Sequence, residues 1–567
     1  MKNNVPKVLF YTALLIALIT GACGGSAPIS GDGYDSAPSN SFVIEAGYGA
    51  ESFLSPESES GKVIADNANF YTVFYSTNKV KNNLNQAGAK NYDKAHAYIL
   101  ESPHWANISG QTIATSNMVI GMTGDLMRSL GYTPGQPTYL TKGQVADLIS
   151  SKTINLDVCN PTQCNSGELF YFAMLNHYSG QNILNFDLVS NQTVLDQTKG
   201  LLENIDISTS TDFDAKKKFL ENSHGYNAIW TYEAEVAQIN FTRIEQGLEP
   251  IYVVYVDGTI DAAVTLFFSP YYQLTDEDKK DASKANRYKA IFEEYVAIAA
   301  TFEKDENIRK AIADSGWRPA QYGAQPSADV LKPEWGFVQD PQTSTGFAPK
   351  YEIAMALNNT FAQVIRKPTV LIYVGDDSGS MTDSFGATDG RSQLIYASNF
   401  IFGPDAESEF LQAINEDITS VYMFDDDDCS HLNTIFGTDT ARLAYQIEST
   451  HLGGNTSMFR CGLNALDEMA QYKTACETTH ECGIVFITDG DDNDCPEDID
   501  NDSCISPTDF NLKRTELGLD FVSVYAIPVG NANMSEIKSV TNVQVCEDAM
   551  TNNTAMIDCF KKIKGSN

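Results

Sequence analysis

The most evident chemistry in the sequence lies in three oxygen-bearing side chains, Asp376, Ser378 and Ser380, which follow an apolar run. The run belongs to the segment TVLIYVGDDSGSM (369–381) and is typical of a strand buried on both faces of a parallel sheet. Ligands of open α/β sheets bind beyond the carboxyl ends of the strands. A carboxylate with two hydroxyls suits a hard divalent cation such as Mg²⁺. The same residue types also cap helices, so this stretch alone leaves both a metal site and a polar turn open.

Two later loops offer further oxygen donors. Thr456 follows a pair of glycines, and Asp489 ends the apolar run 482–488. The order D-x-S-x-S, then threonine, then aspartate after an apolar strand resembles the von Willebrand factor A (VWA, integrin I-like) domain over residues 367–567. The resemblance implies a Rossmann-like doubly wound domain with a metal-ion-dependent adhesion site. In such a site Mg²⁺ or Mn²⁺ would be held by Asp376, Ser378, Ser380, Thr456 and Asp489.

The resemblance also implies how this site works. The metal keeps one coordination position open, and an acidic residue of a protein partner takes that position. The contact is adhesive and requires neither proton transfer nor bond cleavage. Asp377 stands where the family more often has glycine, and we expect its carboxylate to place additional negative charge near the metal.

Apolar periodicity predicts the elements around this site. Helices are expected over 391–402, 439–449 and 545–563, and strands over 418–424, 482–488 and 520–529. Two acidic segments, 425–428 and 489–509, accompany them, and the second contains nine acids in 21 residues. Its carboxylate and amide oxygens could hold Ca²⁺, although an EF-hand glycine and glutamate pattern is missing from its sequence. The other interpretation is a solvated acidic loop that raises the local cation concentration.

The first half of the chain alternates short apolar runs with helical stretches, which predicts parallel sheets covered by helices. A strand over 42–46 leads into a glycine turn, 112–122 reads as two strands around a polar break, and 141–150 as a helix capped by Thr141. The strand 154–158 runs into Asn165-Ser166-Gly167 at the start of a helix. A helix start of this kind suits an anion or another polar ligand, or is a plain cap.

Five segments of this half occur in a familiar order: AYILESPHW, IATSNMVIGM, CNPTQCNSGELF, YNAIWTYEAEV and DSGWRPA. Together they resemble the type II periplasmic solute-binding proteins, in the branch of the phosphate and molybdate binders, over residues 42–325. The resemblance implies two α/β lobes joined by two crossings, with a small solute in the cleft between them. The cleft would be lined by Gly49, Ser102, Thr115, Ser116, Asn165, Ser166, Gly167, Tyr232 and Glu233. The turn around Gly49 lacks the serine or threonine that often binds an anion there, which puts an oxyanion ligand in doubt.

The N-terminus is typical of a targeting segment. Two lysines precede an apolar core, 8–19, that is too short to span a bilayer, and Thr20-Gly21-Ala22-Cys23 follows. This resembles a bacterial lipoprotein signal (1–22) that would make Cys23 the lipidated first residue of the mature chain; an ordinary cleaved signal peptide is the alternative. Residues 23–41 then form a flexible Gly/Ser/Pro-rich tether, and Gly24 favours the outer over the inner membrane as the site of the lipid anchor.

Composition narrows the possible functions. The 567 residues carry a net charge of −36, which argues against nucleic-acid binding because that needs a basic face. Ten cysteines remain after Cys23, two in the first half and eight in the second, which indicates disulfides formed within each half of an exported protein. Cys159–Cys164, Cys476–Cys482 and Cys495–Cys504 are the simplest pairings. A zinc site is the alternative, but C-x₂-C pairs are missing from the sequence.

Residues 326–366 read as a linker that ends in a connecting helix, 351–366. The expected function is therefore that of a non-enzymatic envelope lipoprotein, which binds a protein partner through its metal and a solute between its lobes. The alternative is a transport-associated lipoprotein whose lobes feed a permease. Catalysis is disfavoured because Asp377 interrupts a G-D-S-G motif, no G-x-S-x-G elbow occurs, and no histidine stands in a motif that would serve the serine as base.

Overall fold

The computed structural model describes residues 37, 41–55, 58–68, 70–75, 77–85, 94–209, 211–222, 225–275, 278–320, 325–382, 384–385, 388–403, 406, 411–425, 428–450, 453, 457–490, 505–529, 532, 534–546, 549, 556, 559–561 and 563–564. They belong to two compact units, Met1–Phe361 and Ala362–Asn567. None of the described helices has the length and apolar character needed to cross a membrane.

The first lobe of the first unit is built on a six-stranded sheet in the order β12-β4-β11-β3-β1-β2. Its strands are β1 (Phe42–Gly47), β2 (Phe70–Tyr75), β3 (Ala97–Leu100), β4 (Gln111–Ser116), β11 (Ala262–Phe268) and β12 (Arg318–Pro319). Its helices are η1 (Tyr48–Ala50), α2 (Glu51–Leu54), α3 (Glu59–Ala68), α4 (Thr77–Asn85), η2 (Pro103–Trp105), η4 (Pro270–Tyr272), η5 (Asp278–Lys280), α11 (Ala282–Lys304) and α12 (Glu306–Asp314). The predicted strand over 42–46 is therefore confirmed, and the predicted glycine turn after it is the short 3-10 helix η1.

The second lobe carries another six-stranded sheet, in the order β6-β10-β5-β9-β7-β8. Its strands are β5 (Met118–Thr123), β6 (Thr138–Thr141), β7 (Leu156–Cys159), β8 (Asp206–Thr209), β9 (Ala228–Tyr232) and β10 (Ile251–Asp257). Its helices are α5 (Gly124–Ser129), α6 (Lys142–Ser150), α7 (Asn165–Ser179), η3 (Phe186–Ser190), α8 (Gln192–Leu202), α9 (Asp212–Glu221), α10 (Glu233–Glu245) and η6 (Pro333–Trp335). Thr141 caps α6 as predicted, in a reciprocal capping box with Gln144.

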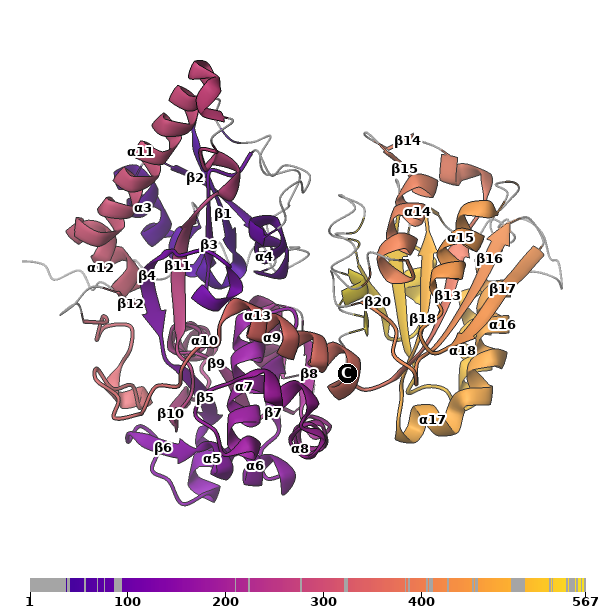
Figure 1. Cartoon of the computed structure of the whole chain (residues 1–567). Helices are drawn as coiled ribbons and strands as arrows, with labels where there is room; N and C mark the ends of the chain where they lie inside the picture. The colour runs from indigo at the N-terminus through magenta and orange to yellow at the C-terminus, as the bar shows by residue number, and fades with distance from the viewer. Residues whose placement is uncertain are drawn as a thin grey trace, which may run out of the picture. The chain divides into compact units, whose positions relative to one another are not determined.

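The chain passes from one lobe to the other between β4 and β5, returns between β10 and β11, and passes over again after β12, since η6 belongs to the second lobe (Figure 1). Because each crossing strand enters its new sheet in the reverse direction, β5 and β11 pair with their neighbours antiparallel. The sheets are therefore mixed, and the expectation of purely parallel sheets was wrong. The pairs β1–β2, β1–β3, β7–β8, β7–β9 and β6–β10 are parallel.

The segment predicted as a linker packs against the first unit. Val330, Leu331, Trp335 and Phe337 are buried in the core of the second lobe. The connecting helix α13 (Tyr351–Thr360) then contacts η2 of the first lobe and η3 of the second. It ends in a short π-helix, η7 (Phe361–Ile365).

The second unit is built on a third six-stranded sheet, in the order β17-β16-β13-β18-β19-β20. Its strands are β13 (Thr369–Asp376), β16 (Ile418–Asp425), β17 (Asp428–Phe436), β18 (Glu481–Thr488), β19 (Ser523–Pro528) and β20 (Val543–Val545). All pairs are parallel except that of the edge strand β17. A helix does not begin at Val545 as predicted, because this residue ends β20; the described residues 556, 559–561 and 563–564 are helical.

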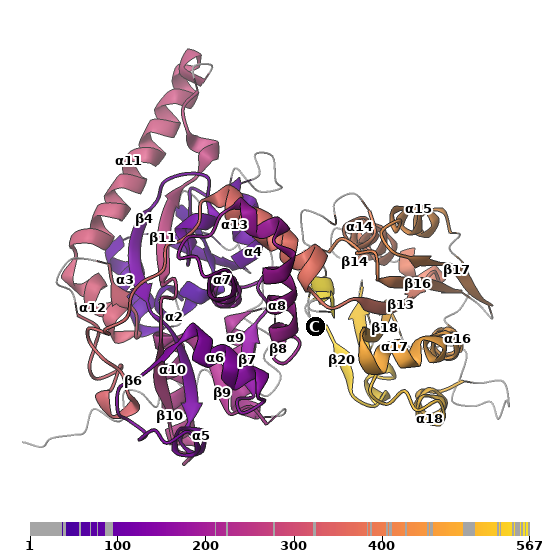
Figure 2. The ribbon, with the colours of Figure 1, turned by 60° about the horizontal axis from the view of Figure 1, so that its bottom comes forward.

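Helices cover both faces of the third sheet. The helices and short elements are η8 (Gly379–Thr382), β14 (Ser384–Phe385), β15 (Thr388–Asp389), α14 (Gly390–Ile401), α15 (Ala441–Ser449), α16 (Met458–Met469), η10 (Ala470–Tyr472), α17 (Lys473–Thr478), α18 (Pro507–Glu516) and η11 (Ile537–Ser539). One core lies under α14 and α15 and the other under α16 and α18; Figure 2 shows the two groups on opposite sides of the sheet. Every residue of β13 is buried between them. The predicted fold class is confirmed: a two-lobed α/β unit like that of periplasmic binding proteins precedes a doubly wound, VWA-like unit.

Four disulfides join described cysteines. They are Cys159–Cys164, Cys429–Cys461, Cys476–Cys482 and Cys546–Cys559. Each bridge lies within one unit, as predicted. Cys23, Cys495 and Cys504 lie outside the described residues.

Candidate metal centre and interlobe site

The centre of the second unit's site is the carboxylate of Asp376, the last residue of β13. This side chain is fully buried. The backbone N–H of Ser378 donates to its Oδ1 at 2.9 Å, and the Thr488 hydroxyl donates to its Oδ2 at 2.6 Å. Burial raises the pKa of Asp376, and these hydrogen bonds act against the rise because they favour the charged form.

A chain of hydrogen bonds links the two strand ends. The hydroxyls of Ser378 and Ser380 lie 3.0 Å apart, and the Ser380 hydroxyl donates to Asp489 at 2.9 Å. Because β13 and β18 are parallel neighbours, their carboxyl ends meet at one edge of the sheet. The structure therefore brings together four of the five predicted ligands, while Thr456 lies outside the described residues.

Thr488 was not among the predicted residues, although it contacts Asp376 directly. Its hydroxyl faces inward at the end of a buried strand, immediately before Asp489. A polar residue at the last position of an otherwise apolar strand is the sequence signal that could have identified it.

Asp377 forms an ion pair with the first turn of α14. Its carboxylate oxygen Oδ1 lies 2.7 Å from Arg391 Nη1. The same guanidinium donates to the backbone carbonyl of Ile447 and to the Thr450 hydroxyl. Asp377 was expected to add negative charge near the metal, and the ion pair with Arg391 compensates that charge.

The donor set around Asp376 fits a hard cation. Carboxylates and hydroxyls are the ligands that Mg²⁺ and Mn²⁺ prefer. Among the described residues, no lysine or arginine forms an ion pair with the buried Asp376 carboxylate. A divalent cation would supply the positive charge that burial of this group otherwise lacks.

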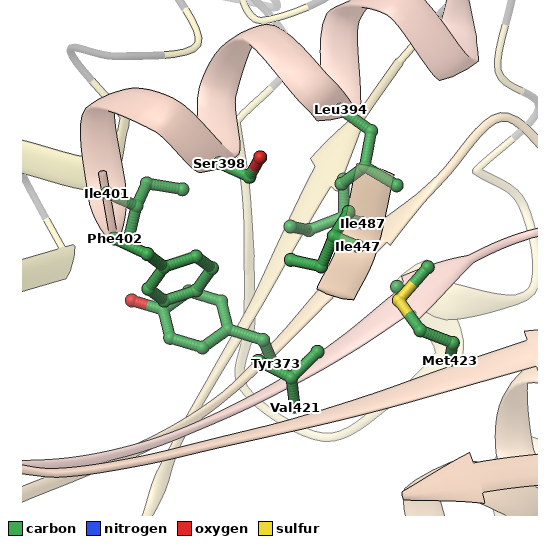
Figure 3. Close-up of a pocket in the computed structure, with 10 residues that line it drawn as sticks. Tyr373, Leu394, Ser398, Ile401, Phe402, Val421, Met423, Ile447 and Ile487 are labelled. Carbon is green, nitrogen blue, oxygen red and sulfur yellow. The ribbon is translucent and has the colours of Figure 1, made fainter. Parts of the chain in front are cut away.

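A small pocket beneath α14 is not a second site. Figure 3 shows apolar side chains around it, with the Tyr373 and Phe402 rings in edge-to-face contact. Its volume is about 10 Å³, room for about one water molecule. We interpret it as a gap in the packing of the core.

The predicted cleft residues of the first unit form two clusters. In the first, the Ser102 hydroxyl of the first lobe donates to the Asn165 side-chain oxygen of the second lobe. The Asn165 amide donates to the Tyr232 hydroxyl at 3.2 Å, which itself lies 3.4 Å from Asp212. The Ser166 hydroxyl also donates to Asp212. All five side chains are buried, so this cluster joins the two lobes.

The second cluster lies at the crossings. Ser116 accepts a hydrogen bond from the Glu233 backbone N–H at 3.1 Å. The Glu233 carboxylate receives two hydrogen bonds from the Arg318 guanidinium, at 2.7 and 2.8 Å, and one from the Tyr255 hydroxyl at 2.6 Å. Thr115 pairs with Arg318 across the β4–β12 ladder. These residues stabilise the crossings. The Glu233 carboxylate already accepts hydrogen bonds from Arg318 and Tyr255.

The two predicted glycines have separate reasons for being glycine. A Cβ on Gly167 would lie 1.9 Å from the Cys159 carbonyl oxygen, so only glycine lets α7 begin so close to β7. A Cβ on Gly49 would lie 2.6 Å from Oε1 of Glu101. Gly167 therefore serves packing, whereas Gly49 makes room for an acidic side chain.

Two buried glutamates were missed. Glu168 of α7 lies 2.6 Å from His104 Nε2, and it also accepts from the Trp105 indole and from the Asn358 side chain of α13. It thus holds both lobes and the connecting helix. Glu101 stands beside the predicted Ser102, and burial raises its pKa to about 8. In both cases, a charged residue inside an apolar stretch is the sequence feature that could have identified the glutamate.

Comparisons with known proteins give structural likenesses alone. Neither a protein-family model nor a curated protein sequence matches the chain. Among solved structures, the chain is similar to the sulfate-binding protein SubI from Mycobacterium tuberculosis H37Rv (12% identity, 49% of this chain, 86% of that one, TM-score 0.33). It is also similar to the periplasmic binding protein AfuA from Actinobacillus pleuropneumoniae (11% identity, 57% of this chain, 98% of that one, TM-score 0.35). A third similar structure is the manganese-loaded TRAP protein of Plasmodium vivax (14% identity, 34% of this chain, 72% of that one, TM-score 0.23). These low scores say nothing about function.

Proposed function

We propose that this chain is a non-enzymatic envelope lipoprotein that binds an acidic protein partner through a divalent cation and a small solute between its lobes. The observation that carries the adhesive part is the hydrogen bond from Ser380 to Asp489, residues 109 positions apart. It places the oxygen donors of two strand ends beside the buried Asp376. Such a convergence of donors is what a cation site requires and a helix cap does not.

The residues that would hold Mg²⁺ or Mn²⁺ are Asp376, Ser378, Ser380 and Asp489, with Thr456 as a fifth. The bound cation would supply a Lewis-acidic position for a partner's carboxylate. Asp376 supplies charge from inside the fold, and the two serines offer neutral oxygens at the loop. The Arg391 guanidinium holds Asp377 apart, so that loop charge does not compete with an acidic partner.

The most triad-like arrangement among the described residues lacks the geometry of a catalyst. Ser420 and Glu468 both contact the Nε2 side of His431, at 3.1 and 3.8 Å. A serine hydrolase uses opposite nitrogens of the histidine for its serine and its acid. Ser420 is also fully buried in the middle of β16, where no substrate reaches it. We therefore favour binding over catalysis.

The remaining parts of the proposal concern the anchor and the lobes. Lipidation of Cys23 would hold the chain on the membrane, and Gly24 favours the outer membrane over the inner one. Metabolic labelling with palmitate should be lost in Cys23→Ser, and persistent labelling would refute attachment at this cysteine. The solute would lie where Ser102, Asn165 and Tyr232 connect the lobes. For the acidic segment 489–509, most of which lies outside the described residues, we favour a solvated loop that raises the local cation concentration over a Ca²⁺ site.

The metal assignment is tested by titrating the full-length protein with Mn²⁺ and with Mg²⁺ in a calorimeter. Asp376→Asn should abolish binding, because it removes the buried carboxylate that anchors the cation. Glu516→Gln is the matched control, since this exposed acid ends α18 at the opposite edge of the sheet. Undiminished binding in Asp376→Asn, with the control also unchanged, would refute the site.

A further inference from the structure

The side chain of Glu101 is an unpartnered carboxylate buried between the lobes. It follows β3, directly before Ser102, whose hydroxyl reaches Asn165 of the other lobe. Glu101 is fully buried, and neither carboxylate oxygen has a hydrogen bond of normal geometry within the described part of the chain. A buried carboxylate without a partner is costly, so its presence needs an explanation.

The turn after β1 is shaped around this carboxylate. A Cβ placed on Gly47 or on Gly49 would lie 2.6 Å from Oε1 of Glu101. Glycine at both positions therefore leaves the space into which the carboxylate points. The Thr77 hydroxyl and the Gly49 backbone N–H lie close enough to lower the pKa of Glu101, although neither is placed for a regular hydrogen bond.

A second carboxylate faces Glu101 from the other lobe. Asp212 begins α9, which contacts η1 of the first lobe. It accepts hydrogen bonds from the Ser166 and Tyr232 hydroxyls, both of which are neutral donors. Burial raises the pKa of Glu101 to about 8, and the charge of Asp212 adds to that rise. Burial likewise raises the pKa of Asp212 to about 7.

The charged groups that act on this pair leave an excess of negative charge. Glu235 raises the pKa of Asp212 and Lys216 lowers it, but Lys216 Nζ already lies 2.8 Å from Glu235 Oε2. The described residues around the two carboxylates therefore offer three acids and one base. An anionic solute would enter a field of its own sign.

The backbone N–H groups that would bind an anion already face an acidic side chain. Backbone N–H groups of a tight turn are the usual donors to an oxyanion, and here the Gly49 N–H faces Glu101. A bare metal ion fits no better. The one group of three potential ligands among the described residues combines Asp212 with Cys159 and Cys164, and these cysteines form a disulfide. A solute with N–H donors and positive charge suits the two carboxylates better than a neutral one, because it also compensates their charge once they are ionised.

We propose that the interlobe site takes a small organic cation, an alkylammonium, held by Glu101 from the first lobe and Asp212 from the second. This inference rests on the proposed function that the lobes bind a small solute. The ammonium group would provide the charge and the N–H donors that both carboxylates lack.

The test uses the full-length protein with Asp376→Asn, in EDTA, so that the second unit's metal site is silent. Its four tryptophans, at 105, 230, 317 and 335, all belong to the first unit, and their fluorescence reports the thermal unfolding of that unit. The probes are 1,4-diaminobutane and ethylammonium, against sodium sulfate and maltose. We expect the amines to raise the unfolding temperature, and their affinity to fall at least about tenfold in Glu101→Gln and in Asp212→Asn.

A control variant and the pH dependence of amine binding complete the experiment. Glu303→Gln, an exposed acid on α11, should bind the amines like the parent. If a site variant fails to fold, the parent protein still decides: amine affinity should increase from pH 6 to pH 8, because the bound cation requires carboxylates that are protonated at the lower pH.

Each other outcome overturns part of the inference. Amine binding that survives both substitutions would place the amine elsewhere. Stabilisation by sulfate or maltose instead would leave solute binding intact and refute the cationic class. If no probe has an effect, both the cationic class and the solute-binding part of the proposed function fail, whereas the Mn²⁺ titration of the second unit is unaffected.

Discussion

Arg391 Nη1 lies 2.7 Å from Asp377 Oδ1, and both side chains are more than nine-tenths buried. The pair connects the loop after β13 to the first turn of α14, beside the candidate ligands Asp376 and Ser378. It therefore fixes the backbone from which those ligands project.

Breaking this pair should destabilise the second unit. Arg391→Met removes the ion-pair partner of the buried Asp377 carboxylate, and we expect the free energy of unfolding to fall by about 3–5 kcal/mol. The second unit has no tryptophan, so its stability is best measured by hydrogen exchange of β13 and β16 peptides in increasing urea.

The double variant Arg391→Met/Asp377→Asn separates charge from packing. Because Asp377→Asn removes the buried charge that Arg391 compensated, the double variant should regain much of the lost stability and remain about 1–2 kcal/mol less stable than the parent. Equal losses in the single and double variants would show that the charge of Asp377 is not what Arg391 compensates.

In this unit, the features that depend on local sequence were predicted, and those that depend on contacts between distant residues were not. β13 and β18 are apolar throughout, and the acids and serines at their ends stand within a few residues of them, so local pattern was sufficient. β17 was missed because its sequence, DCSHLNTIF, is polar and lies on the sheet edge, where burial imposes little pattern. The Asp377–Arg391 pair spans 14 positions, and no local rule joins those residues.

The first unit shows the same division. Gly49 and Ser102 were predicted as cleft residues, and the structure places both beside Glu101, which was not predicted. Whether a glutamate in an apolar stretch is solvated, paired or stranded depends on contacts across lobes, and these arise only from the tertiary fold. Glu233 was predicted as a solute ligand, but its carboxylate forms an ion pair with Arg318, 85 positions away. This partner could not be read from the local sequence either.

The disulfides of the second unit should differ in what they contribute. In the chain-entropy account, stabilisation grows with the length of the closed loop. Cys429–Cys461 spans 32 positions and Cys476–Cys482 spans six. Replacing both cysteines of a pair by alanine should therefore cost about 4 kcal/mol for the first bridge and about 2 kcal/mol for the second. Hydrogen exchange of the second unit in increasing urea measures both losses. A larger loss of stability for the shorter loop would contradict an entropic origin of the stabilisation.

Glu168 should be essential for the closed arrangement of the lobes. Glu168→Ala removes the acceptor of His104, Trp105 and Asn358 together, and stranded buried donors should lower the stability of the first unit by roughly 3–5 kcal/mol. Glu168→Gln retains an acceptor oxygen and should cost about 1–2 kcal/mol. Urea unfolding followed by tryptophan fluorescence measures both, and a loss below about 1 kcal/mol in the alanine variant would disprove this role.

The first unit should also lose stability as the pH rises through neutrality. The pKa of Glu101 is raised to about 8 and that of Asp212 to about 7. A group with a raised pKa contributes stability that is complete below its unfolded value, near 4, and is lost as the pH passes its folded value. Asp157, whose burial raises its pKa to about 7, acts with the same sign. His96, whose pKa burial lowers to about 4, acts oppositely but only below about pH 6.5.

Between pH 6.5 and 8.5 the unfolding free energy from tryptophan fluorescence should therefore decrease, with Glu101 contributing about 2 kcal/mol of the change. Glu101→Gln removes that contribution, so the variant should be the more stable protein at pH 8.5 and have a shallower pH profile. Glu303→Gln, on the exposed face of α11, should follow the parent. A profile in Glu101→Gln that is as steep as the parent's would mean that Glu101 is already ionised at neutral pH.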